Sequence, residues 1–497
     1  MAHGLRVQVA SYNINQQVGK RLLPELHEWL IPTVTQDPRS GYATAGSKPK
    51  GDNGPREAPD IYAVAFQEFA PLPKSLAGIT DSYVYTIDRE LRRTIRMHQP
   101  TVRKDNLYDP LETGGGPENY SLLAAAHHAG LVLYVYSRDN APQRGGQSAT
   151  ARVREVRTST VGTGIGGIMG NKGAVGVRVV LEAGGREEVL TFVGAHLAAH
   201  DHMVKRRNED WKNIVTRLVF APYSTQPLPV VQDRIDPTKP NSIPNEPPKR
   251  PPPRPTANVE YSMYDTNHLF VCGDLNYRIG TKGEGIGGAA PLSKDQVRAM
   301  IANGSPEEWA TLAKHDQLSV QAAIRPARVF QQLTVTDPGM LTPPTYKYKT
   351  GSAAASTSVF DIASQLSAKR IPGWTDRILW STSARLELYR SIMQYTISDH
   401  KPITAILRLE GTSPILSPPW PIDPRWQTLQ YAGYTADRIV GYVWSTLLLL
   451  GSGSLVLAAV ELALLVALAS WWLVTPNPEA TVRAILFALK QKLRVSL

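Results

Sequence analysis

Short apolar stretches recur along the chain up to residue 409, and several of them alternate apolar with polar positions. Successive side chains of a strand point to opposite faces of its sheet, so this spacing predicts β-strands. The expected strands cover residues 5–14, 60–66, 131–136, 173–180, 189–195, 268–273, 376–389 and 402–409. A body rich in β-sheet is therefore expected.

Two segments between these strands have helical spacing instead. Residues 201–220 place Trp211, Val215 and Leu218 on one face and their charges on the other. A second helix is expected after Ser305, a residue type that caps helix N-termini. Strands interleaved with helices predict a layered α/β body.

The pattern changes after residue 442. Residues 443–474 are apolar, with Glu461 as their one charge, and a helix of about 20 such residues crosses a hydrocarbon core. We expect a C-terminal transmembrane segment that anchors the preceding chain on the cytosolic side, followed by a basic tail at 475–497. A hairpin that turns near residues 451–454 or near Glu461 is an alternative, and a buried core helix is a second one.

Two proline-rich stretches interrupt the expected elements. Residues 225–256 contain too much proline for a helix or a central strand, so they are expected to leave the domain surface. They form either a docking site for a proline-recognition module or a disordered loop. Residues 411–442 are interpreted as a proline-rich linker to the anchor. The expected catalytic domain is residues 1–410.

Composition narrows the class of partner. Lys and Arg number 54 against 43 Asp and Glu, a formal net charge of +11 over 497 residues, which favours phosphates, nucleic acid or anionic lipid. Cys272 is the only cysteine, so an intrachain disulfide and a cysteine-built zinc site are both excluded. The N-terminus has no apolar core typical of a secretory signal, and we expect a reducing compartment.

Polar side chains follow several of the expected strands. Asp274 and Asn276 come directly after residues 268–273. The other strand-end residues are Asn13, Asn15, Gln67, Glu68, His196, Asp399 and His400. Each alone is more often a satisfied strand terminus. Together they predict one site with oxygen ligands and two histidines, at the edge of a sheet where open α/β folds bind ligands.

These residue types suit phosphoester hydrolysis. Glu68, Asn13 and Asp274 offer the oxygen ligands that Mg²⁺ prefers, and a bound metal polarises a phosphoryl oxygen. Asp274, oriented by Asn276, is expected to align or deprotonate the attacking water. His400, expected to be held by Asp399, would donate to a phosphoryl oxygen.

Eight motifs in order carry a resemblance to a known family. They are SYNINQQ, AFQEF, GTGIGGIMGNKGAVGVR, AHLAAHDHMVKRRNEDW, CGDLNYRI, PPTYKYK, KRIPGWTDRIL and SDHKPI. The chain resembles the inositol polyphosphate 5-phosphatases of the endonuclease/exonuclease/phosphatase superfamily over residues 5–409, and its expected anchor is similar to that of membrane-anchored fungal members. GDLNYRI and PGWTDRIL are the motifs most specific to this family.

The resemblance implies a DNase I-like four-layered α/β sandwich and Mg²⁺-dependent removal of a 5-phosphate. It implies that Asn13 and Glu68 bind the metal, that Asp274 and Asn276 activate water, and that His196, His400 and Asp399 surround the scissile phosphate. Residues implied to bind the neighbouring 4-phosphate are Tyr346, Lys347, Lys369 and Arg370.

Asn171 and Lys172, on a glycine-rich loop, are expected to help bind phosphate, the alternative being a flexible loop with a solvated lysine. Arg278 and Arg377 are expected either to pair with carboxylates or to bind substrate.

The expected substrate is phosphatidylinositol 4,5-bisphosphate, with the 3,4,5-trisphosphate or soluble inositol polyphosphates as further candidates. A membrane anchor suits a lipid substrate because it raises the enzyme concentration at the bilayer. We expect an endoplasmic-reticulum membrane, phosphoinositide headgroups as partners and no nucleic-acid partner. The alternatives are a phosphodiesterase or nuclease on the same fold, and a catalytically inactive phosphoinositide-binding tether.

Overall fold

The structure is a computed structural model. It describes residues 4–18, 26–30, 58–95, 119–139, 148–183, 185–222, 259–281, 283, 285–323, 328–335, 342–351, 362–367, 370–381, 384–409, 413–451, 454–474 and 482. The proline-rich residues 225–256, Lys369 and all but residue 482 of the expected tail at 475–497 lie outside the described part.

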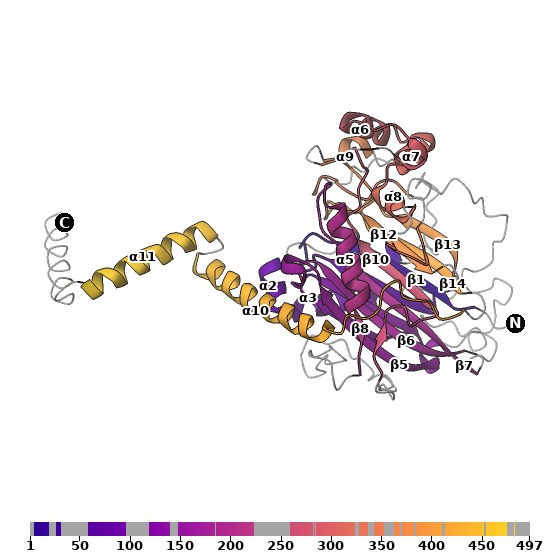
Figure 1. The fold of residues 1–497 in the computed structure, drawn as a ribbon, viewed down its shortest axis with the longest axis horizontal. Helices are drawn as coiled ribbons and strands as arrows, with labels where there is room; N and C mark the ends of the chain where they lie inside the picture. Colours follow the sequence, from indigo (N-terminus) through magenta and orange to yellow (C-terminus); the bar gives the residue numbers. More distant parts are fainter. Residues whose placement is uncertain are drawn as a thin grey trace, which may run out of the picture.

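Within the described part, most strands belong to two six-stranded sheets (Figure 1). The first sheet has the order β13 (Ala384–Ser391), β14 (Ile403–Leu409), β1 (Arg6–Asn13), β2 (Ile61–Gln67), β4 (Leu131–Arg138) and β3 (Tyr120–His128). The second has the order β11 (Leu333–Thr334), β12 (Asp376–Ser381), β10 (His268–Asp274), β7 (Arg186–His196), β6 (Gly173–Ala183) and β5 (Val153–Gly162). β8 (Val219–Phe220) and β9 (Tyr261–Ser262) form a separate short pair.

Helices connect and cover these sheets. Their bounds are α1 His27–Leu30, α2 Leu72–Ala77, α3 Asp81–Ile95, α4 Ala149–Arg152, α5 Val204–Arg217, α6 Lys294–Asn303, α7 Pro306–Ala313, α8 Gln317–Ala323, α9 Ile362–Gln365, α10 Trp426–Leu450 and α11 Leu455–Val474. The expected cap is confirmed, since the Ser305 hydroxyl accepts a hydrogen bond from the Glu308 backbone at the start of α7. The helix expected within residues 201–220 is α5.

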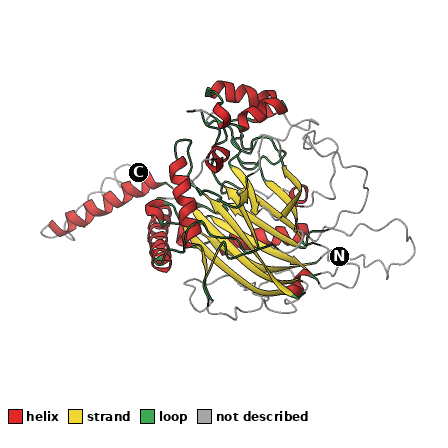
Figure 2. Cartoon of the chain, turned by 45° about the vertical axis from the view of Figure 1, so that its right-hand side comes forward, coloured by secondary structure: helices red, strands yellow, loops and turns green. Residues whose placement is uncertain are grey.

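The core lies in three layers of apolar side chains. Between the two sheets, Val7 and Ile61 of the first pack in one cluster with Val177 and Phe192 of the second. On the outer face of the first sheet, α1 and α3 bury side chains such as Trp29 and Leu91. On the outer face of the second sheet, α5 buries side chains such as Trp211 and Ile214. These clusters give the order helix, sheet, sheet, helix, which is the expected four-layered sandwich. Figure 2 shows the strands in yellow with helices in red around them.

One expected strand is wrong. Residues 376–389 form two strands in different sheets, because β12 pairs with β10 while β13 pairs with β14. In the sequence, the polar residues Ser381, Thr382 and Ser383 separate the apolar positions of β12 from those of β13, and the expected single strand runs across them. The described strands β3 and β5 lie outside the expected ranges.

The C-terminal region differs from the expected linker and anchor. Helix α10 begins at Trp426, inside the expected linker 411–442, and its first half packs on the body next to α2 (Figure 1). No helix in the described ranges is by itself both long and apolar enough to cross a membrane. The pair Trp426–Leu450 and Leu455–Trp471 passes that test together, bent by 83° at the break between the helices. The transmembrane segment at 443–474 stays a prediction.

Candidate active site

The register of the second sheet places three polar side chains in one row at its edge. Asp274, the last residue of β10, is opposite His196 of β7 on one side and Asp376 of β12 on the other. β10 and β7 are parallel, so both of their carboxyl ends reach the same edge, and β12 begins there. Asn13 ends β1 of the first sheet, and its Nδ2 donates to Asp274 Oδ2 over 3.0 Å. The two sheets therefore meet at Asp274.

The Asp274 carboxylate is the most contacted group of the site. His196 Nε2 lies 3.3 Å and His400 Nε2 3.7 Å from its Oδ2, and the backbone N–H of Asn276 donates to its Oδ1 over 3.1 Å. Burial alone would raise the pKa of Asp274, but His400, His196 and Lys172 outweigh burial and hold that pKa well below its usual range. Asp274 is therefore ionised at neutral pH.

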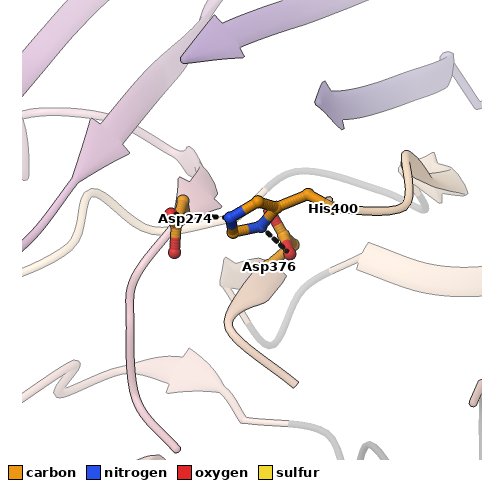
Figure 3. A group of neighbouring side chains, drawn as sticks. All are labelled: Asp274, Asp376 and His400. Atoms are coloured by element: carbon orange, nitrogen blue, oxygen red, sulfur yellow. Dashed lines mark hydrogen bonds and ion pairs between the residues drawn. The ribbon is translucent and has the colours of Figure 1, made fainter. Parts of the chain in front are cut away.

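The His400 imidazole lies between Asp274 and Asp376 (Figure 3). Its Nδ1 is 2.9 Å from Asp376 Oδ2, while its Nε2 faces Asp274. Burial alone would lower the pKa of His400, but the Asp376 and Asp274 carboxylates raise it to about 9. The ring of Tyr346 packs on the imidazole with the ring centroids 4.5 Å apart. His400 is thus a protonated donor at neutral pH in a fixed orientation.

The carboxylate that holds His400 is Asp376 and not Asp399, so the expected Asp399–His400 pair is corrected. Asp399 Oδ2 instead accepts a hydrogen bond from Lys347 Nζ over 2.5 Å. Asp376 Oδ2 also accepts hydrogen bonds from the hydroxyls of Thr345 and Thr375, over 2.7 and 3.1 Å. Asp376 is part of the motif PGWTDRIL, but its role depends on strand pairing, which the sequence does not display.

Glu68, Lys172 and His196 form the other side of the site. Glu68 follows β2, and Gln16 N–H donates to its carbonyl over 2.7 Å, so the ends of β1 and β2 lie together. Glu68 Oε1 is 4.0 Å and Lys172 Nζ is 2.5 Å from His196 Nε2. Burial lowers the pKa of Lys172, and the Glu68 and Asp274 carboxylates partly offset this. An ammonium and a carboxylate thus flank the same imidazole.

The donor set around Asn13, Glu68 and Asp274 fits a hard divalent cation. The Glu68 side chain is 35% exposed, and the Asn13 carboxamide oxygen accepts a hydrogen bond from Asn15 N–H over 3.1 Å, which leaves it a second lone pair. Both oxygens can therefore take a metal, and such cations prefer carboxylate and amide oxygen. Ligand atoms of Asp274, Asp376 and His400 also lie within 4.8 Å of one another. In that group, however, the imidazole and Asp376 are bonded to each other, so we interpret it as a hydrogen-bonded triad.

The expected phosphate-binding residues are only partly brought together. Lys172 is in the site, whereas the Asn171 carboxamide accepts from Ile165 N–H over 3.1 Å and so holds the glycine-rich loop, residues 163–172. Tyr346 contacts His400, and Lys347 reaches Asp399. Arg370 is exposed, its carbonyl accepts a hydrogen bond from Arg298 over 2.6 Å, and its charge acts on His200.

Asn276 and the two arginines support the site. Asn276 has a left-handed φ of 56°, its side chain donates to the Leu197 carbonyl, and it accepts a hydrogen bond from Arg278 over 2.9 Å. The Arg278 guanidinium also lies 4.8 Å from the Tyr346 ring centroid. Arg377 pairs with Asp316 over 3.1 Å, with both side chains buried. The structural interpretation of Arg377 is therefore confirmed.

Comparison with known proteins identifies the family of the chain. Residues 10–406 match the model of the endonuclease/exonuclease/phosphatase family 2. The mouse type II inositol 1,4,5-trisphosphate 5-phosphatase is 29% identical over 70% of this chain and 26% of its own length. Human synaptojanin-2 is 26% identical over 82% of this chain and 22% of its own length. Inositol-1,4,5-trisphosphate 5-phosphatase 1 of Schizosaccharomyces pombe is 26% identical over 81% and 27%.

The chain spans about a quarter of the length of these curated relatives. A crystal structure of the inositol polyphosphate 5-phosphatase domain of SPsynaptojanin, in complex with inositol (1,4)-bisphosphate and calcium, has a similar fold. It is 22% identical, with a TM-score of 0.52 over 89% of this chain and 93% of that one. This likeness supports the DNase I-like fold. From the match that spans residues 10–406, we conclude that the chain belongs to the endonuclease/exonuclease/phosphatase family.

Proposed function

We propose that the protein is a Mg²⁺-dependent 5-phosphatase that hydrolyses the 5-phosphate of phosphatidylinositol 4,5-bisphosphate. The observation that carries the proposal is the convergence of Asn13, His196, Asp376 and His400 around Asp274. The names of the relatives support the substrate class, since they are inositol phosphate 5-phosphatases.

The two central groups have complementary charge states. His400, with its pKa raised to about 9, is positioned to donate a proton or a hydrogen bond to phosphoryl oxygen, where charge develops in the transition state. Asp274 is an ionised acceptor, suited to orient the attacking water and to take its proton. As the water oxygen bonds to phosphorus, the bond from phosphorus to the inositol 5-oxygen breaks, and that oxygen leaves as a hydroxyl with a proton from the imidazolium or solvent. His400 is a donor because carboxylates surround it, and Asp274 is an acceptor because His400, His196 and Lys172 surround it.

Asn13 and Glu68 would hold a magnesium ion, with Asp274 next to them. A bound Mg²⁺ supplies a Lewis acid that neutralises phosphate charge. Lys172, 2.5 Å from His196 Nε2, contributes a second positive charge from the chain itself. Charge-assisted hydrogen bonds from such groups to phosphate contribute about 1.5–3 kcal/mol each.

The 4-phosphate would bind beside this centre. Lys347 is held by Asp399, and the Tyr346 ring packs on His400, so both lie next to the proposed 5-phosphate position. By resemblance to the family, Lys369 and Arg370 are proposed to contribute positive charge to the binding of the 4-phosphate. The 3,4,5-trisphosphorylated lipid and soluble inositol polyphosphates remain proposed further substrates.

We also propose that residues 443–474 anchor the protein in a membrane with the catalytic domain in the cytosol. Support comes from the exposed apolar side chains along α11, such as Leu464 and Leu468, and from the bent helix pair that is long and apolar enough. The endoplasmic reticulum is the proposed membrane, by resemblance to anchored fungal members. A proline-recognition module at residues 225–256 is a further proposed partner.

Phosphate release from water-soluble inositol 1,4,5-trisphosphate tests the proposed chemistry. We expect the full chain in detergent to release phosphate with Mg²⁺ and not after chelation. Asp274→Ala should reduce kcat by about 10³-fold or more, since an acid–base group contributes roughly 10²–10⁴-fold. The control is Asp295→Asn, an exposed residue in the first turn of α6, which should retain activity. Full activity of Asp274→Ala would refute the assigned role.

A further inference from the structure

The Asp437 side chain, on helix α10, is buried between the glycine-rich loop and the end of β3. The backbone N–H of Gly170 donates to both of its carboxylate oxygens, over 2.9 and 3.0 Å. Its Oδ2 also lies 3.0 Å from Nε2 of His128, the last residue of β3. Asp437 is 2% exposed, and a buried carboxylate is costly unless such partners satisfy it. These contacts hold helix α10, the glycine-rich loop and the end of β3 next to one another.

On one side, this contact reaches the lysine of the active site. Gly170 is followed directly by Asn171 and Lys172, whose ammonium contacts His196. A Cβ added to Gly170 would lie 2.6 Å from His128 Nε2 and 2.8 Å from Asp437 Oδ2. The backbone of Gly170 therefore packs directly against the Asp437–His128 pair. Because Lys172 is two residues further on, this contact fixes the position of the Lys172 backbone.

On the other side, the same pair reaches the carboxylate of the active site. The turn Ala129–Gly130 follows His128, and the Gly130 carbonyl accepts from Phe69 N–H over 3.3 Å. A Cβ added to Gly130 would lie 3.7 Å from the Glu68 Cα, which is ordinary contact. The turn thus packs on the backbone of Glu68, the proposed metal ligand.

Helix α10 itself is seated closely on the body. Gly433 faces the glycine-rich loop so closely that a Cβ there would lie 2.3 Å from the Ile168 carbonyl oxygen. A Cβ on Gly441 would lie 2.1 Å from Ala77 N, at the end of α2. Gln430 donates to the Thr160 carbonyl over 2.7 Å. The part of α10 from Gln430 to Gly441 is therefore held by close contacts with the body and cannot act as a loose tether.

We propose that Asp437 is a positioning residue of the active site. It fixes the loop that carries Lys172 relative to the turn that packs on Glu68. Helix α10 then belongs to the catalytic unit and is required even for a soluble substrate that never meets a membrane. The inference rests on the proposed phosphatase function for its kinetic consequence, but its structural consequence for residues 163–172 does not.

The test compares Asp437→Ala and Asp437→Asn with Thr435→Ala in the full chain in detergent. Thr435 is an exposed residue on the same helix, with its hydroxyl bonded only within the helix. Two quantities are measured: kcat and KM for inositol 1,4,5-trisphosphate with Mg²⁺, and amide hydrogen exchange of peptides from residues 163–172.

For Asp437→Ala we expect kcat to fall by about 10- to 100-fold with a smaller change in KM, because small displacements of positioned groups cost rate steeply. Exchange should rise in residues 163–172 and stay unchanged in β7 and β10. Asp437→Asn keeps an oxygen that can accept from Gly170, so its loss should be smaller. Thr435→Ala should match the parent protein within twofold.

Kinetics and loop exchange of Asp437→Ala that match those of Thr435→Ala would overturn the proposal. If Asp437→Ala fails to fold, Asp437→Asn decides: unchanged kcat and unchanged loop exchange overturn it, and a loss in both supports it. If the parent and Thr435→Ala release no phosphate, the proposed function fails. The exchange comparison then still decides whether Asp437 orders the loop.

Discussion

Among single residues, the site depends on which carboxylate pairs with which positively charged side chain. Asp376 accepts a hydrogen bond from Nδ1 of His400, so that Nε2 faces Asp274. Asp399 accepts a hydrogen bond from the Lys347 ammonium. A His400 pKa of about 9 keeps the imidazole protonated at neutral pH. Its charge is lost as the pH rises through about 9, and with it the stabilisation that the two carboxylates provide.

Asp376→Asn should therefore change the pH dependence of the reaction. Without the Asp376 charge, the pKa of His400 should fall towards its usual value, so the alkaline limb of the kcat profile should move to lower pH. We expect a loss of about 10²-fold at pH 8 and a smaller loss at pH 6, since a general acid contributes roughly 10²–10⁴-fold. The measurement is kcat against pH at saturating Mg²⁺.

The control for this prediction is Asp399→Asn. That substitution should weaken substrate binding through Lys347 and move the alkaline limb less than Asp376→Asn does, because Asp399 raises the pKa of His400 less than Asp376 does. An unshifted limb in Asp376→Asn together with a shifted one in Asp399→Asn would contradict the assignment of Asp376.

Sequence reasoning found most residues of the site but not all of their partners. Asp274, His196, His400 and Asn13 are polar residues at strand ends, and the shared edge of a sheet is a general consequence of strand direction. The expected Asp399–His400 pair is wrong because the Asp399 carboxylate binds the Lys347 ammonium, while Asp376 takes Nδ1 of His400. The role of Asp376 follows only from the strand pairing, which places it opposite Asp274.

At the scale of elements, the strand and helix types were largely predictable, and the exceptions have local causes. Alternation and apolar runs located β1, β2, β4, β6, β7, β10 and β14. The break between β12 and β13 falls at the polar residues Ser381, Thr382 and Ser383, which the expected single strand does not take as a boundary. Proline content suggested a linker over 411–442, but the prolines end at residue 424 and α10 starts two residues later.

The apolar helix α11 allows a test of the proposed anchor. We expect the full chain to remain with membranes after alkaline carbonate washing. A matched variant, Leu464→Arg with Leu468→Arg, changes two side chains that are exposed in this structure. Each arginine at the centre of a spanning helix costs about 2.5–3.5 kcal/mol, so this variant should be released. Release of the unchanged chain would contradict membrane anchoring.

At the scale of the whole molecule, the sandwich brings two sheets together at one edge. The first sheet supplies Asn13 and the segment with Glu68, and the second supplies His196, Asp274 and Asp376. The apolar layer between the sheets fixes their spacing, and a displacement of about 1 Å in such a site can cost 10²-fold in rate. The family resemblance predicted this architecture. It did not predict that α10 packs on the glycine-rich loop, because α10 lies outside the eight motifs.

The product formed from phosphatidylinositol 4,5-bisphosphate shows whether the protein removes the 5-phosphate. The full chain is reconstituted with Mg²⁺ in vesicles that contain this lipid, and the products are identified by phosphorus NMR and lipid mass. Our account predicts free phosphate and phosphatidylinositol 4-phosphate in equal amounts, and neither with Asp274→Ala. Retention of the 5-phosphate, cleavage of the phosphodiester to diacylglycerol, or no turnover would contradict it.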